Sequence, residues 1–138
     1  MICGSVWSMA VIPSARPDYA AHVHAVRASL PEVVDSLRSI LGARLCAYIG
    51  AVKETRAVNE WADGLRGPSE QTQRRLRLAL QIAQTIADTD GPEVTRAWFQ
   101  GLNPQLDDRS PARLLREGDI DEVGPEIIAA ERAFLVGG

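Results

Sequence analysis

Apolar residues recur at helical spacing from residue 29 onward. Ser29, Pro31 and Glu32 form a typical helix start, in which a serine caps the first turn and a glutamate three residues later bonds back to it. This pattern predicts a helix that ends at Gly42. Its expected inward-facing residues are Val33, Val34, Leu37, Ile40 and Leu41.

Two shorter helices are expected next. One covers residues 45–49, and after a turn another runs from about Glu54 to Gly64. Val58 and Trp61 would point inward from the second, because residues three apart lie on one face of a helix. Gly64 ends it, since glycine readily adopts the left-handed conformation that follows a last helical turn.

A long helix is predicted after these. Ser69 caps its start, and Gly91 and Pro92 end it and begin a short helix that closes at Gly101. We expect it to form the centre of the core, because an apolar stripe runs along one face and polar residues occupy the opposite face. The stripe includes Leu76, Ala79, Leu80, Ala83, Ile86 and Ala87.

The last part of the chain predicts two further helices. The first begins with Ser110 and Pro111 and ends at Gly118, and Asp119 caps the second. No stretch alternates apolar and polar residues as a strand would. The fold expected from this pattern is an all-α, multi-helix domain. The buried stripe of the final helix should consist of Ile120, Val123, Ile127, Ala130 and Phe134.

The composition agrees with one folded domain. The chain has 138 residues, 46% of them hydrophobic, and no run approaches the roughly 20 apolar residues of a membrane span. Cys3 and Cys46 form no paired motif, so neither a zinc site nor a disulfide framework is indicated. The first residues lack the basic region of a secretory signal, and we expect a cytoplasmic protein.

Charge is distributed unevenly along the chain. Residues 42–80 hold seven basic and four acidic side chains, a net charge of +3, whereas residues 81–138 hold five and eleven, a net charge of −6. Two binding surfaces of opposite sign would produce this asymmetry. Solvated helix faces would also produce it, so both interpretations stay open.

Residues 45–64 have the size and spacing of a helix-turn-helix, a motif that places the start of its second helix in the major groove of DNA. The expected contacts to bases and phosphates come from Lys53, Thr55, Arg56 and Asn59. Two features depart from such motifs. Val52 stands where many of them have glycine, and Glu54 where they have a small hydroxyl residue. A helix-turn-helix kept only as a scaffold is the alternative.

The remaining side chains indicate little chemistry. Arg74, Arg75 and Arg77 could contact phosphates or form a solvated helix face. His22 and His24 have no cysteine or carboxylate at ligand spacing, so no metal site is expected. The sequence contains no phosphate-binding loop and no nucleophile beside a histidine. We therefore expect neither enzymatic activity nor a cofactor.

The order of motifs resembles one family of proteins. VNEWADG, then an arginine-rich helix, AWFQGLNPQL and SPARLLREGDIDEV are similar to the Xre/MbcA/ParS-like antitoxins of RES-Xre toxin-antitoxin operons, over residues 29–136. The chain departs from that family at Asp107 and Asp108, where relatives often have glycine. The most specific part is the order Trp98, Asn103-Pro104, Leu106, Ser110-Pro111, Leu114-Leu115 and Gly118.

The resemblance implies a protein partner. In this family the antitoxin is not catalytic, and its C-terminal region covers the active site of a RES-domain toxin that consumes NAD. It implies a hetero-oligomer with the toxin or a homo-oligomer. We expect three parts: an arm at residues 1–28, where prolines interrupt any helical period, a helix-turn-helix region at 29–68 and, as the resemblance implies, a toxin-binding region at 69–138. The implied toxin-binding residues are Ile128, Arg132, Leu135, Val136, Gly137 and Gly138.

The apolar members of this set agree with an interface, because Ile128, Leu135 and Val136 fall outside the expected buried stripe near the end of the chain. A frayed terminus is the alternative explanation. The sequence therefore favours an antitoxin that blocks a NAD-degrading toxin, and regulation of its own operon through the basic middle stays open beside it. A DNA-binding repressor without a toxin partner is the second hypothesis.

Overall fold

The structure is a computed structural model that describes residues 19–22 and 28–137. Most of the arm predicted at residues 1–28 lies outside this range, and so do Cys3, His24 and Gly138. Residues 19–22 are helical.

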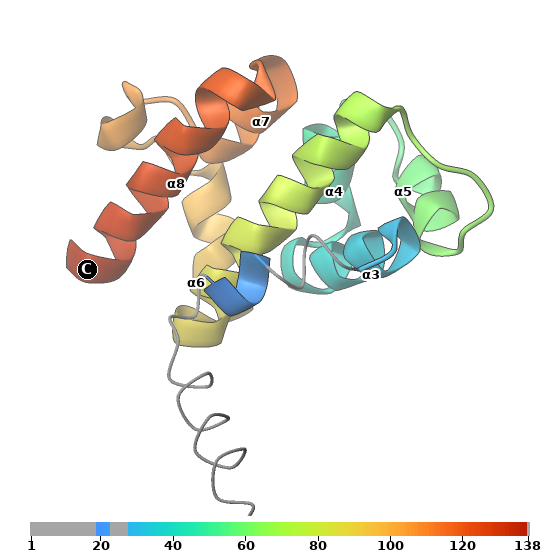
Figure 1. Ribbon diagram of the computed structural model, residues 1–138, viewed down its shortest axis with the longest axis horizontal. Helices are drawn as coiled ribbons and strands as arrows, with labels where there is room; N and C mark the ends of the chain where they lie inside the picture. The colour runs from blue at the N-terminus through green and yellow to red at the C-terminus, as the bar shows by residue number, and fades with distance from the viewer. Residues whose placement is uncertain (1–18, 23–27, 138) are drawn as a thin grey trace, which may run out of the picture.

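Within residues 28–137 the fold consists of helices (Figure 1). The described part of the chain contains no strand, and its one β-bridge is an isolated pairing of Asn103 with Arg109. The predicted all-α class is confirmed for these residues. The elements in order are α3 (Leu30–Leu41), α4 (Ala43–Ile49), α5 (Thr55–Ala62), α6 (Glu70–Gln100), the 3-10 helix η1 (Pro104–Leu106), α7 (Pro111–Glu117) and α8 (Ile120–Gly137).

The predicted start of α3 is confirmed in atomic detail. The Ser29 hydroxyl accepts a hydrogen bond from the backbone N–H of Glu32, and the Glu32 carboxylate accepts one from the backbone N–H of Ser29. These bonds satisfy N–H groups that have no partner inside the helix. Val33, Val34, Leu37 and Leu41 are buried as expected, while Ile40 is only partly buried. Most of the apolar stripe thus faces the core.

The helices α4 and α5 end in the same way. After α4, Ala51 donates to the carbonyl of Tyr48 and Val52 donates to that of Ala47; after α5, Gly64 donates to Trp61 and Leu65 to Glu60. Both are Schellman motifs, which require one residue in the left-handed conformation. Gly64 supplies it after α5 with a φ of 74°, and Ala51 supplies it after α4 with a φ of 60°. The glycine-like position of this turn is therefore Ala51, and its predicted placement at Val52 was wrong.

The long helix breaks where the sequence predicts. Gly91 has non-helical angles, with φ 88° and ψ 167°, so α6 is two helical segments joined at a kink, and Pro92 begins the second. Ile82 is completely buried although it was outside the predicted stripe. Figure 1 shows the reason: α6 runs between the group of α3, α4 and α5 and the group of α7 and α8. A helix with neighbours on two sides buries more than one narrow stripe.

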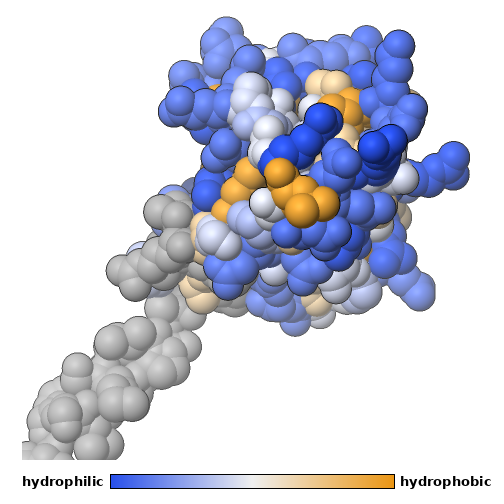
Figure 2. Space-filling model, turned by 90° about the vertical axis from the view of Figure 1, so that its right-hand side faces the viewer, coloured by the Kyte–Doolittle hydropathy of each residue, from blue (hydrophilic) through white to orange (hydrophobic). Residues whose placement is uncertain are grey.

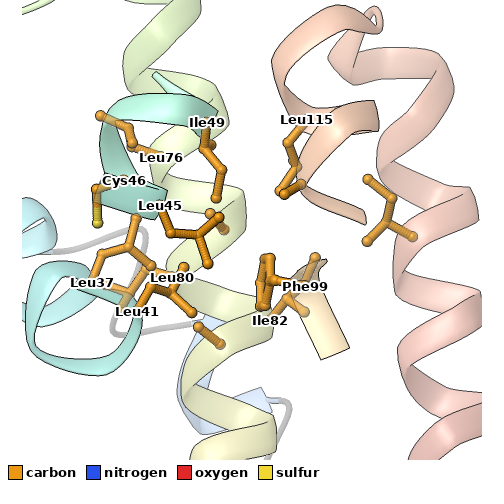
Figure 3. Packing of buried hydrophobic residues seen from close by; sticks show 14 of the residues in the cluster. Leu37, Leu41, Leu45, Cys46, Ile49, Leu76, Leu80, Ile82, Phe99 and Leu115 are labelled. Atoms are coloured by element: carbon orange, nitrogen blue, oxygen red, sulfur yellow. The ribbon is translucent and has the colours of Figure 1, made fainter. Parts of the chain in front are cut away.

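One hydrophobic core joins all of these helices. It extends from Val33 in α3 to Ala130 in α8, and Figure 3 shows α3, α4, α6 and α7 contributing side chains to it. Leu45 and Ile49 of α4 point toward α6, and Phe99 and Leu115 continue the cluster toward α8. The predicted boundary between residues 68 and 69 stays a prediction, because the core is continuous across it.

The segment between α6 and α7 is a tight loop. Asn103 accepts a hydrogen bond from the N–H of Gln105 through its side chain, and Leu106 is buried. Asp107 and Asp108 both adopt left-handed angles, with φ of 56° and 60°. These are the two positions that depart from the glycine of the family the chain resembles. Aspartate tolerates this conformation better than most residues, so the loop can form without glycine.

The last helix packs more of its side chains against the core than expected. Val123, Ile127 and Ala130 are buried as predicted. Ile120 and Phe134, at the two ends of the predicted stripe, are partly buried. Ile128 and Leu135, predicted to lie outside the buried stripe, are also partly buried and packed against the core. The helix continues to Gly137.

Candidate functional site

The predicted DNA-contacting residues lie on and just before α5. Lys53, Arg56 and Asn59 are exposed, and Thr55, the first residue of the helix, is partly exposed. Figure 2 shows the side of the molecule that carries α5 and the loop after it. Hydrophilic residues cover most of this side, and hydrophobic ones form only small patches. Such a surface is compatible with a polar ligand.

Two of these residues already have intramolecular partners. The Asn59 side-chain oxygen accepts a hydrogen bond of 2.8 Å from Arg38, and Arg56 lies 3.4 Å from the Glu60 carboxylate. Glu60 also pairs with Arg66 at 3.0 Å. An asparagine that reads adenine needs both its oxygen and its nitrogen, so Asn59 would have to leave Arg38. The exposed ion pair of Arg56 is weak and can exchange for a phosphate or base.

The cluster of Arg74, Arg75 and Arg77 is largely engaged within the fold. Arg74 pairs with Asp121 of α8, and Arg77 donates to the backbone carbonyl of Ala28 at 2.7 Å. Arg75 is partly buried. These contacts link α6 to α8 and to the segment before α3.

A cleft between α4 and α7 was not predicted. Its lining includes Arg44, Tyr48, Lys53 and Arg116. The Arg116 guanidinium lies 4.7 Å from the centre of the Tyr48 ring and donates a 2.8 Å hydrogen bond to the Tyr48 carbonyl. Local sequence patterns do not indicate this pair, because the two residues are 68 positions apart.

The motif that carries the resemblance and the end of the chain lie together. One groove of about 440 Å³ is lined by Trp98, Leu102, Pro104, Phe134 and Gly137, among others. The ring centroids of Trp98 and Phe134 are 6.3 Å apart, which fixes the end of α8 against α6. We call this surface the C-terminal groove.

The predicted toxin-binding residues divide into two places. Val136 is 89% exposed and precedes Gly137, which lines the C-terminal groove. Arg132 is exposed, and Leu135 is partly buried. Ile128 instead lines a different groove, between α6 and α8, together with His22. The structure thus does not gather this set on one surface.

Two ionisable side chains, those of Cys46 and Glu131, are buried in the core. Burial raises the pKa of the Cys46 thiol to about 12, although nearby Arg38 lowers it in part. Among residues 19–22 and 28–137, no three His, Cys, Asp or Glu side chains are placed to hold a metal ion. Glu131 is only 2% exposed, a burial that its spacing of four residues from Ile127 could have indicated. None of the helices in this part is long and apolar enough to cross a membrane.

Comparison with protein-family models, with curated proteins and with solved structures found no significant match for this chain.

Proposed function

We propose that this chain is an antitoxin that binds a NAD-degrading RES-domain toxin and blocks access to its active site. The observation that carries the proposal is the C-terminal groove. Trp98 and Pro104, part of the motif order that resembles the antitoxin family, line the same groove as Phe134 and Gly137 at the end of α8. Sequence resemblance and surface geometry therefore point to one region of the molecule.

The energetics of this region favour a protein partner. Leu102 lines the groove and is 76% exposed. Val136, which precedes the groove residue Gly137 in the sequence, is almost fully exposed. Covering a large aliphatic side chain contributes roughly 1.5–3 kcal/mol of binding free energy. A pocket that takes the anionic NAD molecule is expected to be cationic, and the negative C-terminal part of this chain is complementary to it.

The test is co-expression with the RES-domain protein encoded by a neighbouring reading frame. We expect a stable complex on size-exclusion chromatography and relief of NAD loss. Leu102→Asp should weaken the complex at least tenfold, because it places a charge in the apolar groove. Leu65→Asp is the matched control, since Leu65 is 74% exposed and lies in the loop after α5. Absence of a complex, or equal losses for both variants, would contradict the proposal.

Removal of residues 136–138 tests the blocking step separately. Val136 makes little contact with the core, so this deletion should leave the fold intact. We expect toxin binding to persist with lower affinity while protection of NAD is lost. Full protection by the shortened chain would show that the last residues do not block the active site.

A second candidate function is DNA binding, either for autoregulation or as a repressor without a toxin partner. It is favoured by the exposed Lys53 and Arg56 at the start of α5. The measurement is binding of duplex DNA from the region upstream of the reading frame. Arg56→Ala and Asn59→Ala should each weaken sequence-specific binding, by roughly 1–3 kcal/mol if they contact bases. Unchanged binding in both variants would remove these residues from the interface.

A further inference from the structure

The cleft between α4 and α7 continues past the start of α5. The cleft is lined by Arg44, Tyr48, Lys53 and Arg116. A second hollow shares Lys53 with it and is also lined by Arg56 and Arg66. The two hollows also share Val52. A connected path of five cationic side chains therefore runs from α7 across the α4–α5 turn to the loop after α5. We call it the basic path.

The cations of the cleft are available to a ligand. Within the described part of the chain, neither Arg44 nor Lys53 has a hydrogen-bond or ion-pair partner. Arg116 is held by the Tyr48 ring and carbonyl, so its guanidinium is already ordered. An ordered guanidinium loses less conformational entropy when it binds an anion.

The carboxylates beside the basic path offset only part of this charge. Glu117 lines the cleft but lies 3.2 Å from Arg113, and Glu60 is shared between Arg56 and Arg66. Glu54 remains as a negative group next to Lys53. The path as a whole is positive, on a chain whose net charge is −3.

We propose that the cleft holds backbone phosphates of duplex DNA, with Arg44, Lys53 and Arg116 as the contacting residues. This inference rests on the DNA-binding candidate above and adds α7 to its interface. The length of the basic path favours a polymer, because a single anion needs only one group of cations, whereas a nucleic-acid backbone presents phosphates in series. Phosphate contacts beside α5 would fix its orientation while its side chains reach base edges.

The experiment compares Arg44→Gln and Arg116→Gln with the unaltered protein on two duplexes, one from the upstream region and one scrambled. Each variant should lose affinity equally for both duplexes, and the slope of log K against log salt should fall in magnitude by about 1. Arg116→Lys should restore most of the slope, since it keeps the charge. Arg74→Gln is the control, because Arg74 is an exposed arginine that pairs with Asp121 away from the cleft.

The possible outcomes distinguish a failure of the cleft assignment from a failure of the DNA-binding candidate. Unchanged slopes in both glutamine variants, with weakened specific binding in Arg56→Ala, would overturn the cleft assignment and leave DNA binding in place. Stronger binding of single-stranded RNA than of duplex would also overturn it. No binding of either duplex by the unaltered protein would refute the DNA-binding candidate itself, and this inference with it. Arg44 is exposed, so loss of folding does not confuse its result.

Discussion

The substitution Ala51→Gly should stabilise the protein. Ala51 closes the Schellman motif after α4 with a φ of 60°. This left-handed conformation costs a residue with a Cβ roughly 1–2 kcal/mol, and glycine avoids that cost. Glycine also has more freedom in the unfolded chain, which removes about 0.5–1 kcal/mol of the gain. The expected net effect is a free energy of unfolding higher by about 1 kcal/mol.

Urea denaturation measures this change. The midpoint should rise with no change in the slope m, because the surface exposed on unfolding stays the same. For a chain of 138 residues, 1 kcal/mol corresponds to a rise in Tm of about 3 °C. The hydrogen bonds of Ala51 and Val52 that define the turn are backbone bonds and do not depend on the side chain.

Two control variants test whether the left-handed conformation of Ala51 is the source of the expected gain in stability. Gly64→Ala makes the reverse change in the second Schellman motif, where an added Cβ would meet only Pro31 at 3.7 Å, so it should destabilise by about 1 kcal/mol. Ala129→Gly makes the same change as Ala51→Gly at an exposed helical position and should destabilise by a similar amount. If Ala51→Gly destabilises like Ala129→Gly, the left-handed strain assigned to Ala51 is wrong.

Four further results are expected. A Cβ at Gly118 would lie 2.5 Å from a side-chain carbon of α8, so Gly118→Ala should lower the free energy of unfolding by about 1–3 kcal/mol in urea denaturation. Ile127→Ala removes a completely buried side chain and should cost about 2–5 kcal/mol in the same assay, whereas Val136→Ala should stay within about 0.5 kcal/mol. In a Cys3→Ser background at pH 8, iodoacetamide should leave Cys46 unmodified in the folded protein and alkylate it in denaturant, because burial raises the pKa of its thiol to about 12. Cys46 should contribute fully to the free energy of unfolding below its unfolded pKa of 9.0, and this contribution should decline as pH rises toward 12, because the unfolded thiol ionises first. Urea denaturation at these pH values measures the change. A free energy of unfolding that does not vary with pH in this range would contradict the expectation.

The sequence alone determined most ends of the helices and most of their buried stripes, although α4 begins at Ala43 and not at residue 45. Ser29, Ser69 and Ser110 each cap the helix predicted from them, and Gly91 breaks the long helix where expected. These features depend on contacts between residues at most four positions apart, so neighbouring residues encode them directly. The resemblance to an antitoxin family likewise came from the linear order of motifs, and it remains a proposal for this chain.

Tertiary structure decided how the surfaces are assembled. The burial of Ile82 depends on helices that pack against both sides of α6, and the groove that Ile128 lines depends on where α8 lies against α6. The Tyr48 and Arg116 pair joins segments 68 residues apart. Local spacing places a residue on a helix face, but only the packing of complete helices determines what that face meets.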